Sequence, residues 1–157
     1  MTSSFDKVSE FNTTFGNAVR TEPGLEYEDV KMRFGLFNEE TTEVGSAYAK
    51  FQFLPEIREV LNQSGLSVEL RNSIMDELLK LVHVEFLDGL ADSLVVLHGL
   101  AQATGMPINE AFDAVHASNM SKAQPDGTVL RREDGKVLKG EDYFAPTEDL
   151  KKILGYK

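Results

Sequence analysis

The chain has 157 residues, of which 41% are hydrophobic and 27% charged, and its formal net charge is -10 at pH 7. These values are ordinary for a folded domain and exclude a disordered, collagen-like or coiled-coil fibrous chain. The absence of cysteine excludes disulfides, thiolate nucleophiles, iron–sulfur clusters and zinc sites with sulfur ligands. Any metal site must therefore use oxygen or imidazole ligands.

The charge is unevenly distributed along the chain. Residues 1–120 carry a net charge of -11, whereas residues 121–157 carry +1. An acidic body argues against nucleic-acid binding, which depends on neutralising phosphates with Lys and Arg. No apolar run approaches the roughly 18 residues of a membrane span, and the N-terminus lacks the pattern of a signal peptide. We therefore expect no membrane association and a cytoplasmic location.

The first part of the chain predicts two helices separated by a loop. Residues 4–15 place apolar side chains at helical spacing, with a serine cap before them and Gly16 as the stop. A loop is expected around Pro23, because proline fixes its own φ and disfavours helix in the preceding residue. From Tyr27 to Phe51 one apolar face recurs every three or four residues, which predicts a long amphipathic helix.

The middle of the chain predicts further helices. Pro55 and the turn signal that follows it predict a short helix within residues 52–66 and then a connection. A helix capped by Ser67 is expected to run to about Val82. Its inward-facing apolar residues are expected to be Leu70, Ile74, Leu78 and Leu81. Residues from Val84 to about Thr104 are apolar almost all round, which favours the centre of a bundle. These last two helices are either separate or continuous.

The end of the chain has a different pattern. Asn109 is expected to cap a helix that ends near Met120, which leaves residues 121–157 as a basic tail. Turn signals at Asp126-Gly127 and Asp134-Gly135 flank short extended segments and predict a small hairpin. Residues 148–157 are either a last helical turn or loose chain. We expect one all-α domain over residues 1–157, with the tail completing its site.

Acidic side chains stand inside or beside the apolar stripes of the two longest helical patterns. On each helix their spacing of three, four or seven residues gives them a common face. They are Glu39, Glu40 and Glu43 on the first helix, and Glu85, Asp88 and Asp92 on the second. Because burying unpaired carboxylates is costly, positive charge must lie between them.

Three kinds of compensation are possible for these acids: Lys or Arg partners, shared protons, and a hard cation. The core face has too few basic residues, so Mg²⁺, or Mn²⁺ in its place, fits the oxygen ligands best. Proteins typically hold Mg²⁺ with a few carboxylates together with substrate phosphates, which predicts metal-assisted hydrolysis of a nucleotide phosphate ester or anhydride. A solvated acidic face is the structural alternative, and it suits Glu39 or Glu85 better than Asp88 or Asp92.

The order of the motifs resembles a known enzyme family. EExxE on one helix and DGLAD on a long apolar helix are followed by FDAVHASNMSK and then by DGTVLRREDGKVLKGEDYFAP. This series is similar to the all-α nucleoside triphosphate (NTP) pyrophosphohydrolases, and within them to the MazG-like and phosphoribosyl-ATP pyrophosphohydrolase-like branch. The resemblance covers residues 8–50 and 82–146.

The resemblance implies an all-α, four-helix-type bundle that forms a homodimer or homotetramer. It also implies Mg²⁺-dependent cleavage of an NTP or dNTP between the α- and β-phosphates, giving the monophosphate and pyrophosphate, as a nucleotide pool-cleaning activity. The family's metal-binding and catalytic carboxylates correspond here to Glu39, Glu40 and Glu43, with Asp92 as a further ligand. Of these, Glu39 is the candidate that orients or deprotonates the attacking water.

The second acidic motif departs from the family pattern ExxD. Glu85 and Asp88 satisfy that spacing, whereas Gly89 stands three residues before Asp92. The ligand pair is therefore either Glu85 with Asp88 or Asp88 with Asp92. The link between the two motifs is also long, and its extra residues, 52–70, form an insertion.

The resemblance also assigns substrate binding to residues of the last helix and the tail. Lysine and arginine suit phosphate oxygens, an asparagine suits a base edge or sugar, and a tyrosine is placed to close over the ligand. The residues are His116, Asn119, Lys122, Arg131, Lys136, Lys139 and Tyr143. The alternatives are a structural histidine at a helix end and a solvated hairpin.

Other functions are also compatible with the sequence. One is hydrolysis of phosphoribosyl-ATP, and another is a non-catalytic, metal-binding helical dimer in which the acids pair with Lys or Arg across the interface. A di-iron carboxylate bundle is disfavoured, because that design needs Glu-x-x-His pairs and the sequence contains none.

Overall fold

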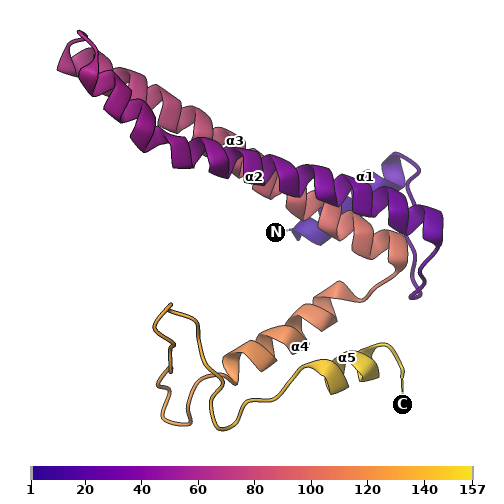
Figure 1. Ribbon diagram of the computed structural model, residues 1–157. Coiled ribbons are helices and arrows are strands. Elements are labelled where there is room, and N and C mark those ends of the chain that lie inside the picture. Colours follow the sequence, from indigo (N-terminus) through magenta and orange to yellow (C-terminus); the bar gives the residue numbers. More distant parts are fainter. Residues whose placement is uncertain (1, 157) are drawn as a thin grey trace. The chain divides into compact units, whose positions relative to one another are not determined.

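The computed structural model describes residues 2–156 (Figure 1). Within this range the chain forms five helices and no strand, so the predicted all-α class is confirmed. The chain divides into two compact units: unit 1 is Met1–Arg20 with Leu25–Thr104, and unit 2 is Thr21–Gly24 with Gly105–Lys157. The single domain expected over residues 1–157 stays a prediction.

Helix α1 (Ser4–Thr14) begins where the sequence predicts and ends one residue before the predicted end. The Ser3 hydroxyl accepts a hydrogen bond from the Asp6 backbone N–H at 3.1 Å, and the Asp6 carboxylate accepts one from the Ser3 N–H at 3.2 Å. This reciprocal pair satisfies two backbone donors that a helix start leaves free. Gly16 follows the helix with a φ of 70°, a left-handed conformation that suits glycine.

Helix α2 (Tyr27–Gln63) continues through Pro55, so the predicted break and separate short helix are wrong. Proline removes one backbone hydrogen bond and costs about 3 kcal/mol in a helix interior. The adjacent Leu54 is only 8% exposed, so tertiary packing holds this turn in place. The insertion at residues 52–70 therefore forms the end of α2, the connection and the start of the next helix.

Helix α3 (Val68–Thr104) is a single helix of 37 residues, so the continuous alternative is correct. The Ser67 hydroxyl accepts a hydrogen bond from the Leu70 N–H at 3.3 Å, as the predicted cap requires. Helices α2 and α3 lie side by side as a long hairpin, and α1 packs on α3 (Figure 1). At 1.5 Å per residue each long helix extends about 55 Å.

Glycine brings α2 and α3 close together. A Cβ atom added to Gly89 would lie 3.0 Å from Val44 Cγ2 and 3.3 Å from the Val44 backbone nitrogen. Both distances are shorter than ordinary van der Waals contacts, so a side chain at position 89 would force Val44 to shift. Further along the hairpin, a Cβ at Gly99 would lie 3.2 Å from Arg33 Nη1. These two contacts fix the antiparallel register of the helices.

A buried polar cluster joins the three helices of unit 1. Asn12 is 1% exposed and donates through Nδ2 to Gln102 Oε1 at 2.9 Å, while its Oδ1 accepts from Arg33 Nη2 at 3.3 Å. Gln102 in turn donates to the Phe5 carbonyl at 3.0 Å. Arg33 is 6% exposed, and its Nε has no partner among residues 2–156. Asn12 is thus the link between α1, α2 and α3.

The apolar core of unit 1 is thin. Its fully buried apolar side chains are Val8, Ala47, Leu54, Met75, Val82, Ala101 and Ala103. Leu70 and Leu81, which the sequence predicts to face inward, are 48% and 61% exposed in the single chain. None of the helices in residues 2–156 combines the length and the apolarity that crossing a bilayer requires.

Unit 2 contains helices α4 (Ile108–Met120) and α5 (Thr147–Ile153). The predicted Asn109 cap is wrong, because Pro107 is the N-cap and its carbonyl already accepts from the Ala111 N–H at 3.0 Å. Helix α5 confirms the helical alternative for the end of the tail.

The predicted hairpin of the tail is a tight reversal rather than a pair of strands. A single antiparallel bridge joins Arg131 to Val137, and the Leu138 N–H donates to the Leu130 carbonyl at 2.9 Å. The Asp134 carboxylate accepts from the Lys136 N–H at 3.1 Å, which is the aspartate turn that the sequence predicts.

Candidate functional site

Acidic side chains from α2 and α3 gather around Glu40. Burial raises the pKa of the Glu40 carboxyl, and the negative charges of Glu43, Asp92, Glu39 and Asp88 raise it further, in that order. Four of the other five predicted acids are therefore close enough to Glu40 to act on it through charge. They come from both helices, as the shared-face argument requires.

The close approach of the helices explains this gathering. Glu43 directly precedes Val44, and Asp88 directly precedes Gly89, the two residues that touch across the hairpin. Asp92 lies four residues after Asp88, one turn further along α3. The acids thus flank a point where Gly89, which has no side chain, lets α3 lie close to Val44 of α2.

Glu85 has a different environment. Lys50 Nζ donates to its two carboxylate oxygens at 2.8 and 2.7 Å, which forms an ion pair between α2 and α3. Glu85 is also absent from the acids that raise the pKa of Glu40. This arrangement favours Asp88 with Asp92 as the pair that faces Glu40, while Glu85 is neutralised by Lys50.

A polar cavity of about 230 Å³ lies beside these acids. Its lining residues come from both long helices: Glu43, Ser46, Ala47, Lys50, Glu85 and Asp88. The cavity therefore connects the Lys50–Glu85 pair with two of the gathered acids. Sequence reasoning missed Lys50, although its position seven residues after Glu43 places it on the same helix face.

The donor chemistry of the cluster fits a hard divalent cation. Every candidate ligand is a carboxylate, and oxygen ligands are those that Mg²⁺ and Mn²⁺ prefer. Within residues 2–156 no three His, Asp or Glu side chains are placed so as to hold an ion. Burial and then like-charge repulsion raise the pKa of Glu40, and a cation among these acids would relieve the repulsion.

Four of the predicted substrate-binding residues contact one another as two pairs in unit 2. Lys122 Nζ donates to Asn119 Oδ1 at 2.7 Å, and Lys139 Nζ lies 4.2 Å from the centre of the Tyr143 ring. Gly140, which follows Lys139, lies against the backbone after Lys122, because a Cβ there would lie 2.6 Å from the Ala123 carbonyl oxygen. The absence of that atom lets the tail pass close to the end of α4.

The tail also folds back through its backbone. Ser118 Oγ donates to the Phe144 carbonyl at 2.8 Å, and the Phe144 N–H donates to Ser121 Oγ at 3.2 Å. His116 stacks on Phe112, with an interplanar angle of 3° and ring centres 6.4 Å apart. His116 thus makes a ring contact within α4, and its role in substrate binding stays a prediction.

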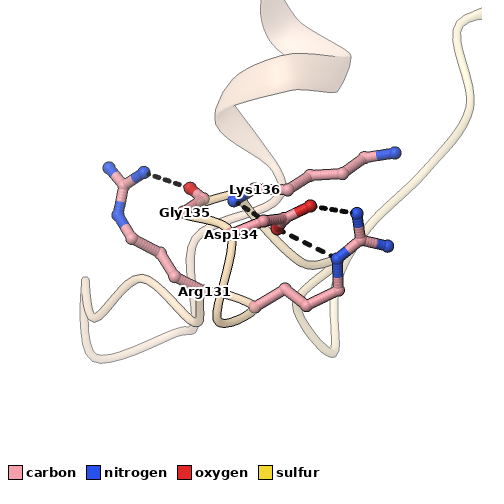
Figure 2. Close-up of polar contacts among 5 residues, drawn as sticks. Arg131, Asp134, Gly135 and Lys136 are labelled. Atoms are coloured by element: carbon pink, nitrogen blue, oxygen red, sulfur yellow. Dashed lines mark hydrogen bonds and ion pairs between the residues drawn. The ribbon is translucent and has the colours of Figure 1, made fainter.

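The remaining two cationic candidates lie at the reversal of the tail (Figure 2). Arg131 Nη1 donates to the Gly135 carbonyl at 2.9 Å, which ties its guanidinium to the turn. Arg132 pairs with Asp134, whereas the Lys136 ammonium group extends away from the turn in Figure 2. The acidic candidates all belong to unit 1 and the predicted substrate-binding residues to unit 2.

Among solved structures, the chain is similar to an Exiguobacterium sp. 255-15 protein that is described provisionally as an NTP pyrophosphohydrolase. The two share 22% sequence identity, with a TM-score of 0.44. The alignment covers 99% of this chain and 96% of that one. No protein-family model and no curated protein matches the chain.

Proposed function

We propose that this protein is a Mg²⁺-dependent nucleoside triphosphate pyrophosphohydrolase. It would cleave an NTP or dNTP between the α- and β-phosphates and release the monophosphate and pyrophosphate. The observation that carries the proposal is the gathering of acids from two helices around Glu40, beside a polar cavity. If these carboxylates closed around a cation, the cavity beside them would leave room for a phosphate-bearing substrate.

The proposed ligands are Glu40 and Glu43 from α2 with Asp88 and Asp92 from α3. When bound, Mg²⁺ would lower the pKa of a water molecule and neutralise charge on the leaving phosphate. The ion pair with Lys50 leaves Glu85 outside this set. A cation among the four acids would also remove the repulsion that raises the pKa of Glu40.

The proposed general base is Glu39. It adjoins Glu40 in sequence and is exposed, so its carboxylate is accessible to water. In the proposed step Glu39 accepts a proton from water while the water oxygen bonds to the α-phosphorus. The bond from that phosphorus to the oxygen bridging the α- and β-phosphates breaks, and pyrophosphate leaves. The basic residues of unit 2 are proposed to bind further phosphate oxygens, with Lys122 as the leading candidate, and Asn119 is proposed to hydrogen-bond a base edge or sugar.

We also propose that the functional form is a homodimer, or a homotetramer built from such dimers. Large apolar side chains line a groove of about 250 Å³ on the hairpin, among them Tyr48, Phe51 and Phe86. These three are 51%, 51% and 37% exposed in the single chain. A second hairpin laid on this face would bury them and complete a four-helix bundle.

The dimer proposal predicts that Phe86→Asp produces monomers, because the substitution places a charge in the covered face. Sedimentation velocity of the full chain measures the species directly. Leu25→Asp is the matched control, since Leu25 is 70% exposed and lies outside the two long helices. Wild-type protein that sediments as a monomer would contradict the proposal.

The reaction itself is tested by separating the products formed from each common NTP and dNTP, with Mg²⁺ and with EDTA. We expect a nucleoside monophosphate and pyrophosphate, formed only with the metal. A nucleoside diphosphate with orthophosphate would mean that the bond between the β- and γ-phosphates is cleaved, which would contradict the proposal. No turnover of any nucleotide would contradict the proposal and favour phosphoribosyl-ATP as the substrate or a non-catalytic dimer.

A further inference from the structure

The ion pair between Lys50 and Glu85 joins two different helices. Three of the other ion pairs join residues three positions apart on one helix, whereas Lys50 and Glu85 come from α2 and α3. Both Glu85 oxygens accept from Lys50 Nζ, at 2.8 and 2.7 Å. These two hydrogen bonds hold the Lys50 ammonium group beside Glu85, between α2 and α3.

That place is the wall of the polar cavity beside the gathered acids. Among the described residues that line this cavity, Lys50 alone is basic, and it faces three carboxylates, those of Glu43, Glu85 and Asp88. A phosphate chain brought to these acids would be repelled by them. Lys50 is the one lining group that attracts it.

The lining also indicates which part of a nucleotide the cavity suits. It contains no aromatic or large apolar side chain on which a base could stack, while Lys50 and Ser46 supply hydrogen-bond donors. An ammonium group is a compact charge that binds phosphate oxygens without needing a planar partner. Phosphate therefore fits this cavity better than a nucleoside.

The ion pair is weak enough to be exchanged. The side chains of Lys50 and Glu85 are 54% and 45% exposed, and a solvated pair of this kind contributes little to stability. Glu85 therefore positions the Lys50 ammonium group but leaves it able to bind another anion. A phosphate oxygen with a higher charge density competes directly for the same donors.

We propose that Lys50 exchanges Glu85 for the pyrophosphate portion of the substrate and holds it as the leaving group. The inference rests on the proposed function, since it assigns the outer phosphates to the cavity beside the same acids. Glu85 acts as a positioning residue that competes with pyrophosphate for Lys50. When pyrophosphate departs, the Lys50–Glu85 pair forms again.

Isothermal titration of the full chain with magnesium pyrophosphate tests this exchange. Lys50→Met is expected to weaken binding by about tenfold or more, the effect of losing one charge-assisted hydrogen bond. Glu85→Gln is expected to tighten binding, because it frees the ammonium group. Lys80→Met is the matched control, since Lys80 pairs with Glu77 within α3 and does not line the cavity.

The Lys50→Met and Glu85→Gln variants distinguish a role of Lys50 in phosphate binding from a purely structural role of the ion pair. If the ion pair only held the helices together, both substitutions would lower the melting temperature and weaken pyrophosphate binding alike, and this result would overturn the inference. Unchanged binding by Lys50→Met, or no binding by the wild type, would also overturn it. Tight binding by the wild type that Lys50→Met weakens, without hydrolysis of any nucleotide, would leave this assignment intact and contradict only the proposed reaction.

Discussion

Replacing Glu40 with glutamine is expected to lower turnover by more than about 100-fold and to raise the melting temperature of the metal-free protein at pH 7. A loss of this size exceeds the effect of removing a mere hydrogen-bond partner of a metal ligand. The rise in stability has a separate cause, because Glu40 ionises beside four other carboxylates. Glutamine keeps the shape of the side chain and removes the charge.

The sign of the stability effect is set by the direction of the pKa shift. The pKa of Glu40 is raised in the folded chain, so the folded state binds the proton more tightly than the unfolded state does. The contribution of Glu40 to stability is therefore highest below its ordinary pKa of 4.5 and falls as the pH rises from there through the raised value. Glu40→Gln is expected to remove this part of the pH dependence.

Melting curves at pH 4 to 8, with EDTA and with Mg²⁺, measure both effects. We expect the wild type to gain stability from Mg²⁺, whereas Glu40→Gln gains less, because a ligand has been lost. The matched control is Glu56→Gln, an exposed position on α2 outside the acidic cluster. Turnover by Glu40→Gln at the wild-type rate would contradict the assignment of the site.

The largest expected effect on stability comes from Asn12→Ala, which should lower the free energy of unfolding by about 3 kcal/mol. The substitution leaves Arg33 buried without its hydrogen-bond partner and leaves Gln102 Oε1 without a donor. A guanidinium stays charged at every accessible pH, so it has no neutral form to adopt. The cost is therefore larger than that of one ordinary hydrogen bond.

Urea unfolding of Asn12→Ala beside Thr13→Ala measures this cost, since Thr13 is the exposed neighbour on the same helix. The double variant Asn12→Ala with Arg33→Met provides a second readout. It should be more stable than Asn12→Ala alone, because the unpaired charge is gone. Equal stability of Asn12→Ala and Thr13→Ala would show that the buried cluster does not hold the three helices together.

Local patterns in the sequence predict much of the fold and part of the site. The Ser3 cap, the Gly16 stop and the aspartate turn at Asp134 depend on neighbouring residues, and all three are confirmed. The acids of α2 and α3 were predictable as helix faces for the same reason. By contrast, Pro55 was expected to end a helix that packing against α3 sustains.

Non-local contacts account for what the sequence does not reveal. The Lys50–Glu85 pair depends on the register of α2 against α3, which Gly89 and Val44 determine across the hairpin. Apolar periodicity identified the face that carries Leu81, but the same pattern arises whether one chain or a second copy covers that face. It therefore did not predict that Leu81 is 61% exposed in the single chain.

Manganese binding, detected as the loss of the free-ion signal in electron paramagnetic resonance, tests the central claim most directly. Mn²⁺ replaces Mg²⁺ at oxygen ligands and is visible without turnover. The wild type is expected to remove Mn²⁺ from solution, and Glu40→Gln to bind it at least about tenfold more weakly. A free-ion signal that the wild type leaves unchanged, or equal binding by the two proteins, would contradict a metal site among the acids of α2 and α3.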